Sequence, residues 1–322
     1  MTLKGLQIGE KRARYCIVQG GMSIRISLAP LAAAVANEGG VGTIGGMGIP
    51  PAELQMHIRE AKLRTSGVVG VNLMYVGSLF DHLLDVCVRE RVDFVAIGAG
   101  LARGPFQKLH NHGIPGLAII SSTKAARIVA QTQGVSGVIV ESGQAGGHLG
   151  PKDPEVSTWD LFPDVLRELR ATGFQGPVIA AGGILHYADV EKALAMGADG
   201  VQLGTRFAMS DESSASPEMK MAWVNATGSQ VEWWSPTGYA SRAIIPHSDI
   251  DLPRIDGVTT RCNGCLKICM HRENKDLSHC ISRALINSQS GNVKHGLVFA
   301  GARVGEITDI IPVKEIFKRL TC

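Results

Sequence analysis

The sequence repeats one pattern eight times between residues 16 and 207: a short β-branched run, a turn with glycine or polar residues, and an amphipathic stretch rich in Ala and Leu. Such alternation of strand and helix is typical of parallel α/β folds. Most of the runs are continuously apolar, as expected for parallel strands covered on both faces. The predicted strands are residues 16–19, 41–44, 68–73, 94–97, 116–120, 137–141, 177–181 and 200–203.

Helical periodicity predicts helices at residues 28–37, 52–64, 79–91, 105–112, 124–133, 161–171 and 188–196. We take residues 216–225 as the eighth helix and residues 310–320 as a closing helix that packs on the barrel. Eight consecutive βα units of this length favour an α/β fold of the (β/α)8 TIM barrel type, with an open doubly wound sheet as the alternative. We therefore expect a barrel over residues 1–225, a lid and cysteine-rich extension over residues 226–309, and a C-terminal helix over residues 310–322.

Composition and charge exclude several classes of function. The net charge is +3 and 19% of residues are charged, without the Lys/Arg stripe of a nucleic-acid-binding protein. No run approaches the roughly 20 apolar residues of a spanning helix, and no secretory signal is recognisable. We expect a cytoplasmic protein that binds neither membrane nor nucleic acid, in which the seven cysteines are reduced rather than paired as disulfides.

Glycine and polar residues follow the predicted strands where a barrel places its active site, at the carboxyl ends of the strands. Loops after the seventh and eighth strands of such barrels commonly bind a phosphate through backbone N–H groups. A Gly-Gly pair followed by a Gly-Thr pair suits this role, because absent side chains let the backbone approach the anion. The strand ends in question carry Gln19, Gly20, Gly21, Met22, Asn72, Glu141, Gly146, Gly147, Gly182, Gly183, Gln202, Gly204 and Thr205.

Six separated motifs occur in the same order as in the nitronate monooxygenases, formerly called 2-nitropropane dioxygenases, and in the flavin-type enoyl-acyl-carrier-protein reductases. The sequence resembles these families over roughly residues 15–210 and again near residues 297–320. Ile17 stands where the common motif has proline. The motifs are Gln19-Gly20-Gly21-Met22, Gly39-Gly40-Val41-Gly42, Gly70-Val71-Asn72, Ala145-Gly146-Gly147-His148-x-Gly150, Val178-Ile179-Ala180-Ala181-Gly182-Gly183-Ile184 and Gly197-Ala198-Asp199-Gly200-Val201-Gln202-x-Gly204-Thr205-Arg206-Phe207.

The resemblance implies one FMN across the barrel mouth. On matching positions, Gln19, Gly20 and Met22 would lie against the isoalloxazine, with Asn72 near its polar edge. The ribityl phosphate would be surrounded by Gly182, Gly183, Gln202, Gly204 and Thr205, and we expect Gly21, Glu141, Gly146 and Gly147 to complete the cofactor site.

His148 is the candidate acid/base residue. An imidazole titrates near pH 6.5, so it can exchange a proton with a carbon acid or a developing enolate at neutral pH. It follows Gly146-Gly147 on a loop at the catalytic face, whereas His110 and His112 look like an exposed helix end. The alternative is a loop histidine that only forms hydrogen bonds with the backbone, but the surrounding motif favours the acid/base role.

Four late cysteines form a second signal, Cys262-x₂-Cys265-x₃-Cys269-x₁₀-Cys280. Four thiolates can hold a [4Fe-4S] cluster or a structural zinc, and unmetallated thiols are the third alternative. The spacing resembles the cluster segment that follows the barrel in the dienoyl-CoA reductase and trimethylamine dehydrogenase group. We therefore favour [4Fe-4S].

These observations leave three functions open. The first, which the motif set favours, is FMN-dependent redox chemistry of the nitronate monooxygenase type on a small activated carbon substrate, with His148 as acid/base. The second is reduction of an activated C=C bond in an enoyl thioester, which the cluster favours because oxygen reoxidises flavin without a relay. The third is a non-catalytic flavin-binding regulator with a zinc site and a surface bearing Trp233 and Trp234.

Partners are less constrained by the sequence. A small-molecule substrate is expected, and the electron donor is a ferredoxin, a flavoprotein or NAD(P)H. No separate G-x-G-x-x-G unit indicates a nicotinamide domain, and a homodimer is left open.

Overall fold

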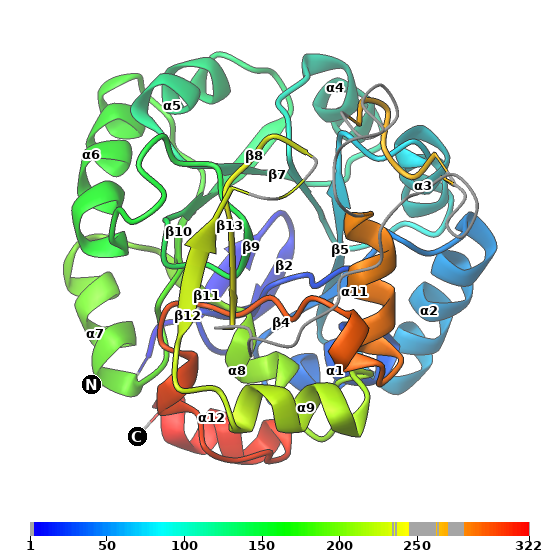
Figure 1. Cartoon of the computed structure of the whole chain (residues 1–322). Helices are drawn as coiled ribbons and strands as arrows, with labels where there is room; N and C mark the ends of the chain where they lie inside the picture. Colours follow the sequence, from blue (N-terminus) through cyan, green and yellow to red (C-terminus); the bar gives the residue numbers. More distant parts are fainter. Residues whose placement is uncertain are drawn as a thin grey trace.

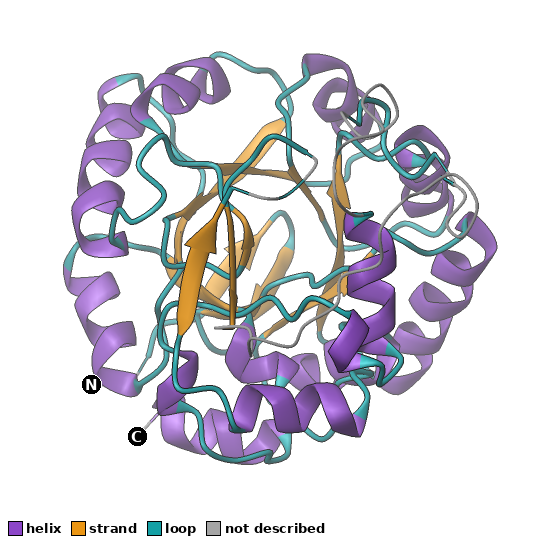
Figure 2. Ribbon diagram, viewed as in Figure 1, coloured by secondary structure: helices purple, strands orange, loops and turns teal. Residues whose placement is uncertain are grey.

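Eight parallel strands close into a barrel, with the last strand pairing back to the first (Figures 1 and 2). The computed structural model describes residues 3–233, 235, 237–244, 262, 264–269 and 280–321. The open doubly wound alternative is therefore wrong, and each predicted barrel strand is confirmed. In ring order the strands are β3 (Ile17–Gln19), β4 (Val41–Gly45), β5 (Val68–Met74), β6 (Val95–Gly98), β7 (Gly116–Ile120), β8 (Val135–Glu141), β10 (Val178–Ala181) and β11 (Gly200–Leu203).

Seven helices follow the first seven barrel strands along the chain (Figure 1). Their inward faces are buried, as Leu83, Leu84 and Cys87 illustrate in α3. The helices are α1 (Ala29–Asn37), α2 (Pro51–Arg64), α3 (Phe80–Arg89), α4 (Arg103–Asn111), α5 (Thr123–Ala130), α6 (Thr158–Ala171) and α7 (Tyr187–Ala195).

The eighth place in the helical ring is taken by α12 (Val313–Thr321), which contacts α1 and α7. We expected the helix at residues 216–225 to stand there. That segment does form α9 (Pro217–Val224), but α9 packs on α11 (Ile281–Gln289) and on two short 3₁₀ helices, η1 (Val293–His295) and η2 (Val304–Glu306), instead. The expected position of the eighth helix is thus wrong, because helical periodicity does not specify which groove a helix fills.

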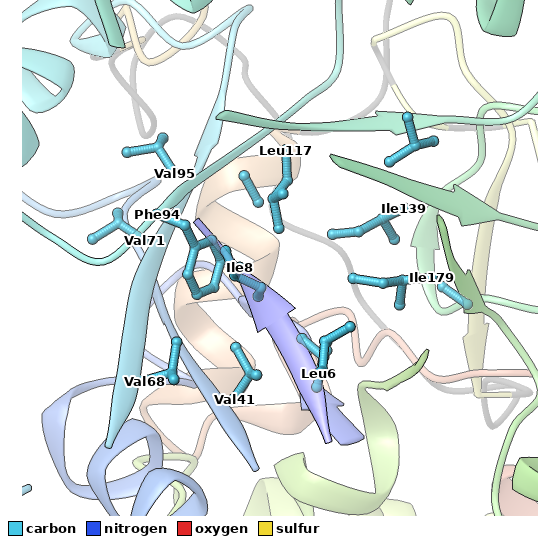
Figure 3. Packing of buried hydrophobic residues seen from close by; sticks show 14 of the residues in the cluster. Leu6, Ile8, Val41, Val68, Val71, Phe94, Val95, Leu117, Ile139 and Ile179 are labelled. Carbon is cyan, nitrogen blue, oxygen red and sulfur yellow. The ribbon is translucent and has the colours of Figure 1, made fainter. Parts of the chain in front are cut away.

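An N-terminal hairpin of β1 (Leu6–Ile8) and β2 (Lys11–Ala13) closes the amino end of the barrel. Leu6 and Ile8 are almost fully buried and join the central apolar cluster together with Phe94, Ile139 and Ile179 (Figure 3). Because apolar side chains fill the barrel at this end, its open mouth lies at the opposite, carboxyl end.

A second, antiparallel sheet lies across the carboxyl end of the barrel. Its strands are β12 (Ser229–Glu232), β13 (Ser241–Ile244) and β9 (Gly147–His148), in that order. The segment 297–303 extends it through a bridge between Ala243 and Phe299. Among the described helices, none is long and apolar enough to cross a membrane.

Phe317 is the residue through which α12 closes the ring. It is buried, its ring lies 6.0 Å from those of Tyr15 and Phe207, and Gly40 leaves room for its edge. We predict that Phe317→Ala lowers the free energy of unfolding by about 3–5 kcal/mol, because it leaves a cavity between α12 and the barrel. Thermal and denaturant unfolding measure the change. Lys318→Ala, on the exposed side of the same helix, should change stability by less than about 0.5 kcal/mol, and equal effects of the two variants would contradict this role for Phe317.

Candidate functional site

The barrel brings the predicted strand-end residues together at one rim. Parallel pairing places Glu141 opposite Ala181, and Ala181 opposite Gln202. Residues paired in this way share one face of the sheet. Ile139, two residues before Glu141, lies inside the barrel (Figure 3). Glu141 and Gln202 therefore face the barrel axis at its carboxyl end.

The loop after β3 is held close to the neighbouring strand ends. Gln19 is fully buried, its side-chain oxygen accepts a hydrogen bond from the Thr43 backbone N–H at 3.0 Å, and its amide donates to the Gly20 carbonyl. A Cβ on Gly21 would lie 2.3 Å from the Cβ of Asn72. Only glycine allows this approach, so residues 19–22 pass directly beside Asn72 in the barrel mouth.

The two glycines after β10 have conformations that side chains disfavour. Gly182 and Gly183 have φ of +106° and +65°. A Cβ on Gly182 would lie 2.3 Å from the Ser142 hydroxyl oxygen, so this glycine is also needed for packing against the loop after β8.

Gly204, after β11, differs from them because no described atom lies within 4 Å of an added Cβ. The neighbouring Thr205 hydroxyl accepts a hydrogen bond from the Gly301 N–H at 2.9 Å and keeps its own proton free to donate. The loop after β11 thus leaves open space beside a hydroxyl donor.

His148 is fixed by a sheet rather than carried on a loose loop. It is the last residue of β9 and pairs with Ser241 of β13, while the Leu149 N–H donates to the Ala240 carbonyl at 2.8 Å. Gly146 packs against Ala300, where an added Cβ would lie 2.6 Å from the carbonyl carbon. The close packing of Gly146 therefore helps to fix the position of the strand that carries His148.

Two side chains hold the His148 ring. Its Nε2 lies 2.7 Å from the Ser235 hydroxyl, which lies 2.9 Å from the Thr237 hydroxyl. Phe299 meets the ring edge-to-face at 5.3 Å. Burial lowers the pKa of His148 to about 4, so its imidazole is neutral at pH 7.

Glu141 is the second titratable group of the rim. The residue is half-buried at the end of β8, and desolvation by the surrounding protein raises the pKa of its carboxyl to about 7. Desolvation disfavours the charged carboxylate, just as it disfavours the charged imidazole of His148. At pH 7 the His148 imidazole is therefore neutral and the Glu141 carboxyl is about half protonated, and such shifted pKa values are common among catalytic groups.

Sequence reasoning missed Ser235 and the segment 297–303. Besides Phe299, this segment contributes Gly301, which bonds to Thr205, and Arg303, whose guanidinium donates to the Gly183 carbonyl at 3.1 Å. In the sequence, the only sign of this segment was the resemblance to the nitronate monooxygenases, which resumes near residues 297–320. No local pattern marks Ser235, because its partner is 87 residues away in the sequence.

The four cysteines lie outside this cluster, beside the loop after β5. The Cys265 carbonyl accepts from the Ser78 N–H at 3.1 Å, and its Sγ lies 2.9 Å from the Ser282 hydroxyl. Burial raises the pKa of the Cys265 thiol, and the charges of Cys280, Cys269 and Cys262 raise it further. Within the described residues, no three His, Cys, Asp or Glu side chains are arranged to hold a metal ion. Trp234 lies outside the described residues, whereas Trp233 is exposed.

A cavity of about 310 Å³ lies at the other end of the molecule. It is lined by Lys11, Lys62 and Arg91 among others, beside the amino ends of β5 and β6. Residues at this face of a barrel contribute to stability rather than to chemistry. We therefore place the site at the carboxyl rim.

Known proteins resemble the chain over most of its length. The family model of nitronate monooxygenase matches residues 6–78 and 74–322. A Rhodococcus jostii protein named (3aS,4S,5R,7aS)-5-hydroxy-7a-methyl-1-oxo-octahydro-1H-indene-4-carboxyl-CoA dehydrogenase is 34% identical over 207 residues, which cover 64% of this chain and 56% of that protein. A probable nitronate monooxygenase of Staphylococcus aureus is 30% identical over 66% of this chain and 70% of its own length.

Solved structures agree with these matches. FabK from Thermotoga maritima is 30% identical and superposes with a TM-score of 0.78, covering 96% of this chain and 92% of FabK. A nitroalkane oxidase from Streptomyces ansochromogenes, 22% identical with a TM-score of 0.75 over 96% of this chain and 95% of its own, shares the fold.

The raised pKa of Glu141 predicts a pH-dependent cost to folding. A carboxyl that titrates near 7 when folded and near 4.5 when unfolded loses stability as pH rises from about 4.5 to 7. Glu141→Gln carries no charge, so we expect its melting temperature to exceed that of the parent by roughly 2–6 °C at pH 8, with a much smaller difference at pH 5. Thermal melts at both pH values measure this, with Glu191→Gln on the exposed side of α7 as control. A pH-independent difference would contradict the assignment.

Proposed function

We propose, from the premise that the chain belongs to the nitronate monooxygenase family of oxidoreductases, that it binds FMN at the barrel mouth and reduces the C=C bond of an α,β-unsaturated acyl thioester. The observation that carries the proposal is His148, an imidazole kept neutral by burial and held by Ser235 at the rim. The chain spans about 56% of the length of its Rhodococcus relative, whose name specifies a carboxyl-CoA compound. That protein's substrate therefore supports only the class of substrate.

The rim fits a flavin phosphate. Gly204 borders open space, Thr205 retains a free hydroxyl proton, and Gly182 and Gly183 turn the chain beside them. The Thr43 hydroxyl oxygen is buried without a partner among the described residues, close to Gly21. It would face the ring system together with Asn72 and Gln19. When bound there, FMN supplies hydride transfer.

His148 would supply the proton that C=C reduction requires. Ser235 orients the ring through Nε2, so Nδ1 is the atom left for the substrate. A neutral imidazole is a poor acid, but negative charge that develops on an enolate beside it raises its pKa and favours uptake of a proton from solvent. The ring can then pass that proton to the α carbon. Glu141, whose pKa is about 7, would be a second proton carrier in the same mouth.

Oxidation of a nitronate is the second candidate, and the family model favours it. A nitronate is an anion, and a neutral imidazole does not attract it. Arg242 of β13 does not offer a free positive charge to such an anion, because its guanidinium donates to Glu155 at 2.5 Å and to the Gly143 carbonyl at 2.9 Å. The uncharged carbon of an enoyl thioester suits this environment better.

The proposal includes electron supply. We propose that the four late cysteines hold a [4Fe-4S] cluster, with zinc as the alternative, and that a ferredoxin, a flavoprotein or NAD(P)H provides the electrons. A homodimer remains compatible with this function.

Removal of the imidazole tests the role of His148. We predict that His148→Ala lowers kcat/KM for reduction of a short enoyl thioester by roughly 10²–10⁴-fold, because a positioned proton donor is lost. Ser235→Ala should lower kcat and shift the pH profile while leaving the flavin bound. His112→Ala, at the exposed end of α4, is the matched control. Full activity of His148→Ala with the thioester, or turnover with nitronates alone, would refute the proposal.

Gly204→Val tests the phosphate site independently of turnover. Open space beside Gly204 lets the protein fold with a side chain there, so the expected effect is loss of flavin without loss of structure. We predict a fall of at least about tenfold in FMN affinity, because the side chain occupies the phosphate position. Flavin content after denaturation and circular dichroism measure the two properties. Gly104→Val, where an added side chain also meets open space, should retain FMN.

A further inference from the structure

The loop after β3 contains a strained turn. Ile24 and Arg25 have left-handed φ of +52° and +59°, and they are two of the four non-glycine residues with such φ in the described part of the chain. Residues with a Cβ rarely adopt this conformation, and a β-branched residue such as Ile24 adopts it least readily. Two consecutive residues of this kind persist only where the surrounding structure holds them. Other contacts of the loop must therefore oppose the strain.

The turn fixes the backbone of Met22 in the barrel mouth. The Met22 N–H donates to the Ser27 hydroxyl at 2.8 Å, and the Met22 carbonyl accepts from the Ser27 N–H and from the Ser27 hydroxyl, both at 3.1 Å. A Cβ on Gly45 would lie 2.2 Å from the Met22 carbonyl oxygen, so this carbonyl also lies close against the end of β4. Because the bonds to Ser27 close a loop around the turn, a change of φ within it would break them and displace Met22.

Arg25 is held by a carboxylate of the neighbouring helix. Its Nε and Nη2 donate to the two carboxylate oxygens of Glu53, both at 2.7 Å. Glu53 lies in the first turn of α2, where the helix dipole also favours its negative charge. The two side chains are only 37% and 23% exposed, and two parallel hydrogen bonds fix their geometry. The ion pair therefore ties the strained residue firmly to α2.

The backbone bonds of the turn lie on either side of Arg25. The Ile24 N–H donates to the Met47 carbonyl at 3.0 Å, and the Ile26 N–H donates to the Ser23 carbonyl at 3.3 Å. Among the contacts of the described residues, every hydrogen bond of Arg25 belongs to its ion pair with the helix. The side chain of Arg25 thus provides the support that its own backbone lacks.

We propose that Arg25 and Glu53 are positioning residues for the flavin, because their ion pair holds the left-handed turn that keeps Met22 at the barrel mouth, where the isoalloxazine would lie. This inference rests on the proposed function. The pair acts through Met22 and need not touch the flavin or the substrate. Its loss should therefore misplace a bound flavin, while the imidazole of His148 keeps its own partners.

Arg25→Gln tests this role, because it removes the ion pair and keeps a residue with a Cβ at the left-handed position. We expect the FMN-saturated variant to reduce a short enoyl thioester with a kcat about 10–100-fold lower than the parent, since a small misplacement of reacting groups has effects of this size. KM should change much less, and the visible absorption spectrum of the bound FMN should shift. Glu53→Gln should have the same effect, and the double variant should be no worse than either single variant, because all three lose one shared interaction.

Arg127→Gln is the matched control. Arg127 of α5 donates to both carboxylate oxygens of Glu168 of α6, at 2.7 and 3.0 Å, so it forms the same kind of pair between two outer helices. Its loss should change thermal stability about as much as Arg25→Gln does, without altering kcat or the flavin spectrum. Parent-like kcat and spectrum in Arg25→Gln, or equal changes in both variants, would overturn the proposal. A parent protein that binds no FMN would instead refute the proposed function, and this inference with it.

Arg25→Gly separates positioning from a direct effect of charge on the flavin. Glycine adopts a left-handed φ readily, so the turn can persist without the ion pair. We therefore expect Arg25→Gly to have a kcat severalfold higher than that of Arg25→Gln, and a flavin spectrum closer to that of the parent. Equal impairment of the two variants would show that the charge of Arg25, rather than the turn, is what matters, and the positioning role would be wrong.

Discussion

Closure of a parallel barrel is the constraint on which the site depends. Parallel pairing from β3 round to β11 puts every strand's carboxyl end on one rim, while Leu6 and Ile8 of the hairpin fill the other end. Groups separated by more than a hundred residues, such as Asn72 and Gln202, are thereby directed to one mouth. Desolvation in this mouth then disfavours charge on both Glu141 and His148. The fold and the chemistry thus have a common cause.

Much of the fold was predictable because local chemistry and global topology agree in it. Each barrel strand is a continuous apolar run that must be covered on both faces, and such runs are visible in the sequence. The place of α9 was not predictable, because an amphipathic helix carries no label for its partner. Its buried residues, Met219 and Trp223, face the segment that ends at Ile307 rather than the barrel core. Long-range packing, rather than local sequence, therefore determines where α9 lies.

The site was predictable to the same extent. The positions of Gln19 to Thr205 at the strand ends could be predicted because glycine and polar residues break an apolar run at a known offset, whereas their role stays a prediction. Ser235 and Phe299 were not found, since their contact with His148 depends on pairing between β9 and β13, and β9 has only two residues. The cysteine motif was visible as spacing. Its attachment to the loop after β5 follows from backbone bonds that any residue type could make.

The position of α12 has a consequence for synthesis. Residues 313–321 emerge from the ribosome after every barrel strand, yet they cover the groove between α1 and α7. Until then Phe207 and Tyr15 lack their apolar partner Phe317, so the nascent chain exposes hydrophobic surface in this groove.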